Sequence, residues 1–188
     1  MVNVKMREVW VISGIPSVGK TTTSFALANK LEKSSVISGD DLQDQIVSGS
    51  VGPTELPKED SDMQIELTVR NQAILAKSYA DSGFTPVCDN VFGRRQLGIF
   101  LNLLKGYQVH LVNLTADFTV IQDRDMKRIL EEKFDNPDRW TLLFTLTSEL
   151  SGIGLWIDNS LRTPEETVDH ILNYKNDAMI SFAKGELI

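Results

Sequence analysis

The chain has 188 residues, 41% of them hydrophobic and 24% charged, a composition that suits one globular domain with its own core. Its formal net charge of −7 argues against a surface that neutralises a phosphate backbone, so no nucleic-acid partner is expected. The single cysteine, Cys88, cannot form an internal disulfide, and no apolar run is long enough to span a bilayer. We therefore expect a cytoplasmic protein with no membrane partner.

Short β-branched runs alternate along the chain with longer stretches of helical periodicity. This alternation predicts an α/β fold, in which helices cover both faces of a parallel sheet. The clearest helix start is Thr163, because Pro164 and two glutamates follow it. The predicted strands are 9–13, 34–38, 85–91, 108–114 and 154–158, and the predicted helices are 20–33, 40–48, 60–82, 94–105, 117–133, 138–150 and 164–174.

Two segments have the composition of long loops. Residues 48–60 are rich in glycine, proline and serine, and residues 131–140 contain Asn-Pro-Asp. Loops of this length within a compact domain are often functional. We therefore expect a single domain over residues 1–188 with two lid segments, 48–60 and 124–140.

The stretch "VISGIPSVGKTT", residues 11–22, contains the pattern G-x-x-x-x-G-K-[ST], with Gly14, Gly19, Lys20 and Thr21 at its fixed positions. The glycines allow backbone N–H groups to turn inward around a β-phosphate at the positive end of the following helix. Lys20 is expected to bridge the β- and γ-phosphates, and Thr21 to bind magnesium. The predicted nucleotide-binding residues are Gly14, Ile15, Pro16, Ser17, Val18, Gly19, Lys20, Thr21 and Thr22.

Other motifs distinguish among the classes of P-loop protein. A water-activating ATPase usually has a strand that ends in Asp-Glu, whereas the third predicted strand ends in Asp89 and Asn90. A guanine-nucleotide switch needs Asn-Lys-x-Asp after a later strand, and residues 112–117, "VNLTAD", lack it. These absences favour a small phosphotransferase.

Carboxylates at the ends of two predicted strands are candidates for chemistry. A phosphoryl acceptor must lose a proton, which calls for a carboxylate near the P-loop. Asp40 and Asp41 follow the second strand, and we expect Asp40 to be the base and Asp41 to cap the helix; ordinary helix-start residues are the alternative. Asp89 is expected to accept a magnesium-bound water, so Thr21 and Asp89 form the predicted metal site, although Asp89 also fits a strand-ending turn.

Together these motifs resemble the chloramphenicol phosphotransferase-like and zeta-toxin-like small-molecule kinases, a family of the AAA_33 type. The resemblance rests on the P-loop form Gly-x-Pro-x-x-Gly-Lys-Thr and on the Asp-Asn that ends the third strand. It also rests on "SGDDL" (38–42), "LTADFTVIQDRDMKR" (114–128) and "IDNSLRTPEETVDHIL" (157–172). It covers most of the chain, residues 8–174.

The resemblance implies the kinase-type P-loop NTPase fold, three α/β/α layers around a five-stranded parallel sheet with strand order 2-3-1-4-5. It implies that Asp40 activates the acceptor and that Lys20 clamps the phosphates. It also implies that Arg124 and Arg128, on a helix after the fourth strand, close on the transferring phosphoryl group, with Arg139 beyond a turn. The alternative for these arginines is surface pairing with neighbouring acids.

The sequence therefore predicts a phosphotransferase that uses ATP or GTP and Mg²⁺ to phosphorylate a hydroxyl group of a small molecule. An antibiotic-like molecule, a sugar or a nucleotide sugar would suit the resemblance. The alternatives are a nucleoside or nucleotide kinase and a non-catalytic nucleotide-binding regulatory protein. The sequence leaves open the acceptor, the choice between ATP and GTP, and the oligomeric state.

Overall fold

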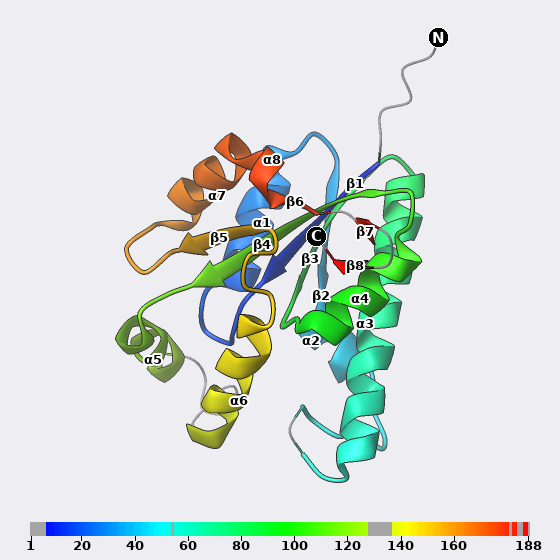
Figure 1. Cartoon of the computed structure of the whole chain (residues 1–188), viewed down its shortest axis with the longest axis vertical. Coiled ribbons are helices and arrows are strands. Elements are labelled where there is room, and N and C mark those ends of the chain that lie inside the picture. The colour runs from blue at the N-terminus through cyan, green and yellow to red at the C-terminus, as the bar shows by residue number, and fades with distance from the viewer. Residues whose placement is uncertain (1–6, 54, 128–136, 181, 184–185, 188) are drawn as a thin grey trace.

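The computed structural model of the chain describes residues 7–53, 55–127, 137–180, 182–183 and 186–187. Its middle layer is a mostly parallel sheet with the strand order β2-β3-β1-β4-β5, as predicted (Figure 1). The strands of this sheet are β1 (Glu8–Ser13), β2 (Ser34–Ser38), β3 (Thr85–Asn90), β4 (Gln108–Thr115), β5 (Leu155–Asp158) and β6 (Met179–Ile180), and a separate hairpin pairs β7 (Phe182–Ala183) with β8 (Glu186–Leu187).

The predicted sheet of five parallel strands is extended by β6, which pairs antiparallel with the amino-terminal half of β4. β5 pairs only with Val112–Thr115, so the neighbouring stretch of β4 has an open edge, and β6 covers it at Val109 and His110. A strand of two residues has no alternating pattern of its own, which is why the sequence does not predict it.

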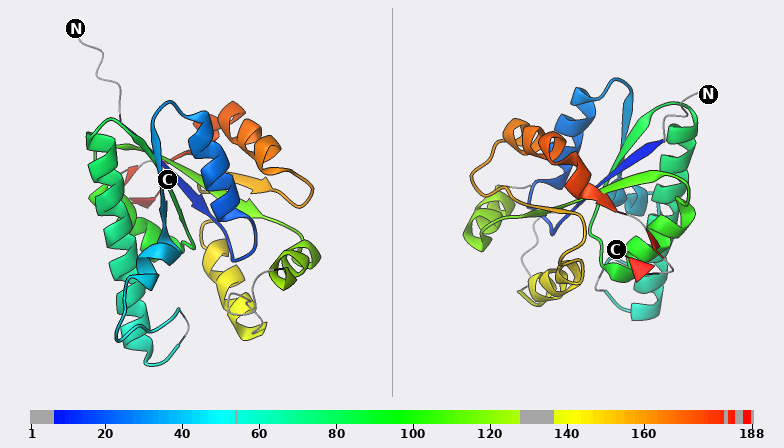
Figure 2. Two further views of the ribbon diagram at one scale, coloured as in Figure 1. Left: turned by 180° about the vertical axis from the view of Figure 1, so that it is seen from behind. Right: turned by 45° about the horizontal axis from the view of Figure 1, so that its top comes forward.

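Helices cover both faces of the sheet, α3 and α4 on one and α1, α7 and α8 on the other (Figures 1 and 2). All seven predicted helix starts lie within two residues of the observed ones, because capping and turn residues mark them. The helices are α1 (Lys20–Lys30), α2 (Gly39–Asp44), α3 (Lys58–Asp81), α4 (Arg94–Leu103), α5 (Phe118–Met126), α6 (Pro137–Ser148), α7 (Pro164–Asn173) and α8 (Lys175–Ala178).

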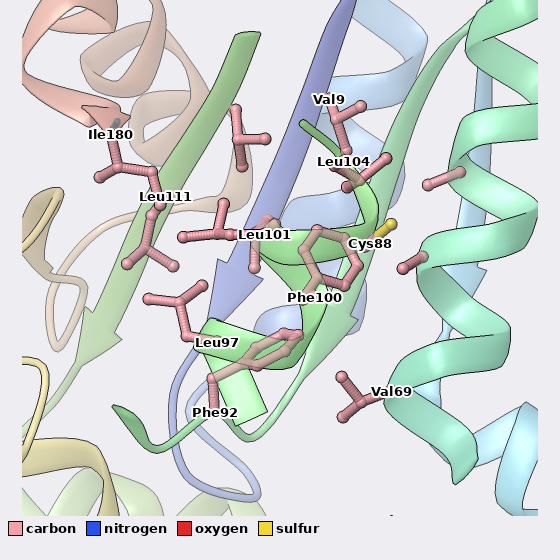
Figure 3. Packing of buried hydrophobic residues seen from close by; sticks show 14 of the residues in the cluster. Val9, Val69, Cys88, Phe92, Leu97, Phe100, Leu101, Leu104, Leu111 and Ile180 are labelled. Atoms are coloured by element: carbon pink, nitrogen blue, oxygen red, sulfur yellow. The ribbon is translucent and has the colours of Figure 1, made fainter. Parts of the chain in front are cut away.

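The core between the sheet and α4 shows why the strands are hydrophobic throughout. Leu97, Phe100 and Leu101 of α4 point toward β1 and β3, where they meet Val9 and Cys88 (Figure 3). Strands that are buried on both faces lose the alternation of a half-exposed strand, and Val9 and Cys88 are both fully buried. The packing fixes β1 in the middle of the sheet, and with it the loop that follows.

The parallel strands all end at one edge of the sheet, where ligands bind in open α/β folds. The P-loop follows β1, α2 follows β2, and α5 follows β4 at this edge. α5 and α6 lie beyond it (Figure 1). None of the described helices combines the length and apolarity that crossing a membrane requires.

The two predicted lid segments are only partly loops. In the first, 48–60, the helix α3 already begins at Lys58. In the second, 124–140, α5 ends at Met126 and α6 begins at Pro137, while residues 128–136 lie outside the described part of the chain. The predicted helix 117–133 is therefore described only as far as residue 127. The lid role of both segments stays a prediction.

Candidate active site

The P-loop turns sharply from β1 into α1, and its geometry requires glycine at the first fixed position. Gly14 has φ +149°, and a Cβ there would lie 2.6 Å from the Leu114 carbonyl oxygen and 2.8 Å from Cγ1 of Val18. Gly19, with φ +103°, precedes the first residue of α1. The loop thus places the amino end of an 11-residue helix at the carboxyl edge of the sheet, where it attracts anions.

The side chain of Lys20 lies inside the curl of this loop. It is 9% exposed, and its Nζ donates a 3.1 Å hydrogen bond to the carbonyl oxygen of Ile15. The helix N-terminus and the ammonium group therefore act on the same small volume. Two sources of positive potential converge there, as a bound phosphate chain requires.

A cavity of about 520 Å³ opens above the P-loop. Asp40, after β2, and Pro164, after β5, both line it, so it extends across the carboxyl edge between the two outer parallel strands. Its charged lining residues are three cations and one carboxylate, which favours an anionic ligand. The lining residues are Pro16, Ser17, Gly19, Lys20, Thr21, Thr22, Thr23, Asp40, Val91, Arg124, Asn159, Arg162, Pro164 and Thr167.

Six of the nine predicted nucleotide-binding residues line this cavity, and three do not. Gly14, Ile15 and Val18 are buried beneath the loop, and Ile15 and Val18 belong to the hydrophobic core. Their side chains anchor the loop to the sheet.

Asp40 and Asp41 are both exposed in the first turn of α2, but only Asp40 lines the cavity. The prediction that Asp41 caps this helix is wrong. Ser38 is the N-cap residue, and its Oγ accepts a 3.3 Å hydrogen bond from the Asp41 backbone N–H. A serine at the strand end has the extended backbone that an N-cap needs, which leaves the aspartates in the first turn, where their charge suits the helix dipole.

Asp89 is the second-last residue of β3 and is 2% exposed, and its Oδ2 has no hydrogen-bond partner among the described residues. Burial raises the pKa of Asp89 to about 6. The charge of Lys20 and hydrogen bonds from Ser38 and Thr21 oppose this rise in pKa, while the charge of Asp40 adds to it. A cation is the ligand that would satisfy a buried carboxylate oxygen in this position.

Thr21 and Asp89 fit a magnesium site that has few protein ligands, and not one that is formed by protein side chains alone. The described residues contain no group of three His, Cys, Asp or Glu side chains that could hold a metal ion. Mg²⁺ in phosphoryl-transfer sites typically keeps waters and binds through substrate phosphates with one or two protein ligands. The unpartnered Oδ2 of Asp89 and the hydroxyl of Thr21, which lines the cavity above the P-loop, are consistent with that ligand set.

Among the described residues, Arg124 is held against the P-loop by two backbone carbonyls and the Asn159 side chain, and not by an acidic side chain. Its Nη1 donates to the carbonyl oxygen of Val18 at 3.1 Å, and its Nη2 to the carbonyl oxygen of Asn159 at 3.0 Å. The Nδ2 of Asn159 donates to the same Val18 carbonyl at 2.8 Å. The second predicted lid arginine, Arg128, lies outside the described residues, and so does the side chain of Arg139.

Two residues in this network were missed from the sequence. Asn159 joins the loop after β5 to the P-loop, and Asp125 accepts a 2.7 Å hydrogen bond from the hydroxyl of Ser17. Both pairs connect residues more than a hundred positions apart. The motif "IDNS" in the resembling segment was the one signal that could have identified Asn159.

The fold and this site define a kinase-type P-loop protein. The model of the AAA_33 family, described as an AAA domain, matches residues 9–140, and the chain belongs to that family. No sequence among the curated proteins matches the chain.

Solved structures share the fold at low sequence identity. An unliganded sugar kinase from a Janibacter species is 20% identical, covers 93% of this chain and 96% of its own, and has a TM-score of 0.64. The tunicamycin resistance protein of Deinococcus radiodurans is 19% identical over 93% of this chain and 98% of its own, with a TM-score of 0.63. The APS kinase of Mycobacterium tuberculosis, in complex with AMPPNP and APS, is 13% identical over 91% of this chain and 98% of its own, with a TM-score of 0.64.

Proposed function

We propose that the protein transfers the γ-phosphate of ATP or GTP to a hydroxyl group of a small molecule. The observation that carries this proposal is that one cavity contains the P-loop lysine, the Thr21 hydroxyl and a carboxylate, Asp40, that is neither a helix cap nor buried. Several similar structures are named as kinases of small molecules, among them a sugar kinase and a gluconokinase, which supports this class of reaction.

Each residue has a role that its position supports. Lys20 neutralises charge on the β- and γ-phosphates, and the N-terminus of α1 holds the phosphate chain. Asp40 accepts a hydrogen bond from the acceptor hydroxyl and takes its proton as the bond to phosphorus forms. Arg124 provides positive charge beside the transferring group, and the resemblance assigns the same role to Arg128.

Thr21 and Asp89 would hold Mg²⁺, Thr21 through its hydroxyl and Asp89 through a bound water. The ion would supply positive charge that offsets the negative charge of the phosphates. Because the donor is a nucleoside triphosphate, we place the reaction in the cytoplasm, where ATP and GTP are available.

The test is product analysis. The protein is incubated with Mg²⁺ and [γ-³²P]ATP, or [γ-³²P]GTP, and a panel of small alcohols, and label in a phosphomonoester is measured; Lys20→Ala is the control. A labelled acceptor supports the proposal. Nucleotide binding with neither transfer nor slow hydrolysis would indicate a regulatory nucleotide-binding protein and contradict it.

A further inference from the structure

A second cavity of about 510 Å³ lies on the other side of the loop that follows β3. The beginning of α3 and of α4 form one wall, and α6 forms the other; Figure 2 shows α6 facing these helices beyond the carboxyl edge of the sheet. It equals the nucleotide cavity in size and differs from it in chemistry. We propose that this cavity holds the acceptor and selects a largely apolar alcohol that is uncharged or cationic, an inference that rests on the proposed phosphotransfer.

The loop that follows β3 has residues near both cavities. Val91 lines the nucleotide cavity, and Gly93 packs against the second one. A Cβ on Gly93 would lie 2.3 Å from Cδ1 of Leu146 and 2.9 Å from Oε1 of Gln96, and both of these residues line the second cavity. A glycine here lets α6 approach the loop closely, so the wall of the second cavity begins two residues after Val91, which lines the nucleotide cavity.

The helix that carries Asp40 is also fixed to this wall. Gln43 of α2 donates to Oε1 of Gln64 at 3.2 Å and accepts from the hydroxyl of Thr68 at 2.9 Å, and both partners belong to α3. The next residue of α3, Ile65, lines the second cavity. These hydrogen bonds hold the helix that carries Asp40 against the helix that lines the second cavity.

The walls are apolar and partly exposed to water. Ile65 on α3 is half-buried, and Leu143 on α6 is buried. Leu142 on α6 is 51% exposed, and Leu56, on the opposite wall, is 85% exposed. Covering such side chains with an apolar ligand contributes about 25 cal/mol for each Å² removed from water. The acceptor is expected to have an apolar body for this reason.

The charges disfavour an anion. Among the described residues that line the cavity, four are carboxylates, and the two cations are already ion-paired: Lys58 with Asp62 at 2.6 Å, and Arg95 with Glu66. The nucleotide cavity has the opposite balance, with three cations and one carboxylate. A phosphate or sulfate group in the second cavity would meet an excess of two negative charges and lose its water without gaining a partner.

Gln96 adds a polar contact. Its Oε1 is buried and has no hydrogen-bond partner among the described residues. A hydroxyl or ammonium group on the acceptor would supply the missing donor, and a phosphate oxygen would not. Charge and hydrogen bonding therefore favour the same class of acceptor.

The test measures binding, so that it is independent of transfer. Isothermal titration calorimetry on the full chain, loaded with Mg²⁺ and AMPPNP, uses a panel of aryl and alkyl alcohols, each in an uncharged, an amine-bearing and a phosphate-bearing form. The uncharged and amine-bearing forms are expected to bind about tenfold or more tightly than the phosphate form. Leu142→Ala should weaken their binding several-fold, whereas Leu103→Ala, an exposed leucine of α4 away from the cavity, should not.

A charge variant sharpens the comparison. Asp62→Asn removes the ion-pair partner of Lys58, so it should reduce the difference in affinity between the uncharged and the phosphate-bearing forms. Glu59→Gln makes the same change of charge on α3 outside the cavity lining and should leave this difference unchanged. Equal or preferred binding of the phosphate forms, or no binding of any alcohol, overturns the proposal. If uncharged or cationic alcohols bind selectively but are not phosphorylated, this inference stands and the proposed phosphotransfer is contradicted. If an anionic acceptor is phosphorylated, the proposed phosphotransfer stands and this inference is contradicted.

Discussion

The hydroxyl of Ser17, in the middle of the P-loop, donates a 2.7 Å hydrogen bond to Oδ1 of Asp125 on α5. Ser17 has φ +61°, a left-handed conformation that costs a residue with a side chain roughly 1–2 kcal/mol. Asp125 is 7% exposed, so the bond lies largely out of water. The helix after β4 thus supports the backbone conformation of the phosphate-binding loop.

Substitutions at Ser17 separate the hydrogen bond from the backbone strain. Ser17→Ala removes the bond and keeps the strain, and we expect it to weaken AMPPNP binding by about tenfold, since one hydrogen bond to a charged group contributes roughly 1.5–3 kcal/mol. Ser17→Gly also removes the bond but relieves the strain, and should bind more tightly than Ser17→Ala. Calorimetric titration with AMPPNP checks the order; an alanine variant that binds like wild type would show that Asp125 does not support the loop.

Removal of the P-loop ammonium should abolish transfer. Lys20 is the cation that the curl of the loop encloses, and Lys20→Ala should cost several kcal/mol of transition-state stabilisation, because no other group replaces its charge. Steady-state kinetics measures the loss, and circular dichroism confirms that the variant is folded. A folded variant that turns over normally would contradict the P-loop assignment.

The contribution of Arg124 to activity should depend on the planar shape of its guanidinium group as well as on its charge. Its two terminal nitrogens contact two carbonyl oxygens, one on the P-loop and one after β5, an arrangement that a lysine cannot reproduce. Both Arg124→Ala and Arg124→Lys are expected to lower kcat/KM for the nucleotide by about a hundredfold. If lysine restores activity, positive charge alone is sufficient and the contacts to Val18 and Asn159 are incidental.

Asp89 makes a pH-dependent contribution to stability whose sign is opposite to that of an ion-paired carboxylate. Its pKa is raised from 3.8 to about 6 in the folded state, so the free energy of unfolding falls between pH 4 and pH 6, where only the unfolded state has lost the proton. Above pH 6 the full cost, roughly 2–4 kcal/mol, is present. Asp89→Asn should therefore be more stable than wild type at about pH 8 without Mg²⁺, and little changed at about pH 4.

Urea denaturation at the two pH values measures this difference. Mg²⁺ and AMPPNP should protect the wild-type protein more than the asparagine variant, because the ion favours the ionised carboxylate. The same stability difference at both pH values would show that Asp89 is not ionised on passing from pH 4 to pH 8.

Local signals in the sequence were sufficient for the sheet and the P-loop. Each parallel strand is a short hydrophobic run, and the spacing from Gly14 to Thr21 encodes a strand–loop–helix turn that the structure contains. The order of the strands needed the family resemblance, because hydrophobic periodicity shows which segments are strands but not which are neighbours.

The contacts that complete the site could not be read from local patterns. Val18 meets Asn159, and Ser17 meets Asp125, only after β4 and β5 have been placed beside β1. The capping residue of α2 was assigned wrongly for a local reason, since serine and aspartate are about equally good N-caps and the end of β2 decides between them.

The central claim is that Asp40 activates an acceptor hydroxyl, and the most direct measurement compares the transfer rates of Asp40→Asn and Asp41→Asn with the acceptor found by product analysis. Neither side chain caps α2 and both lie in its first turn, so the two variants should lose the same small stabilisation by the helix dipole and keep the nucleotide affinity of the wild type. We expect Asp40→Asn to lose about 10²–10⁴ in kcat, the contribution of a general base, and Asp41→Asn to stay within a few-fold of wild type. Normal transfer by a folded Asp40→Asn variant, or an equal loss in both, would contradict it.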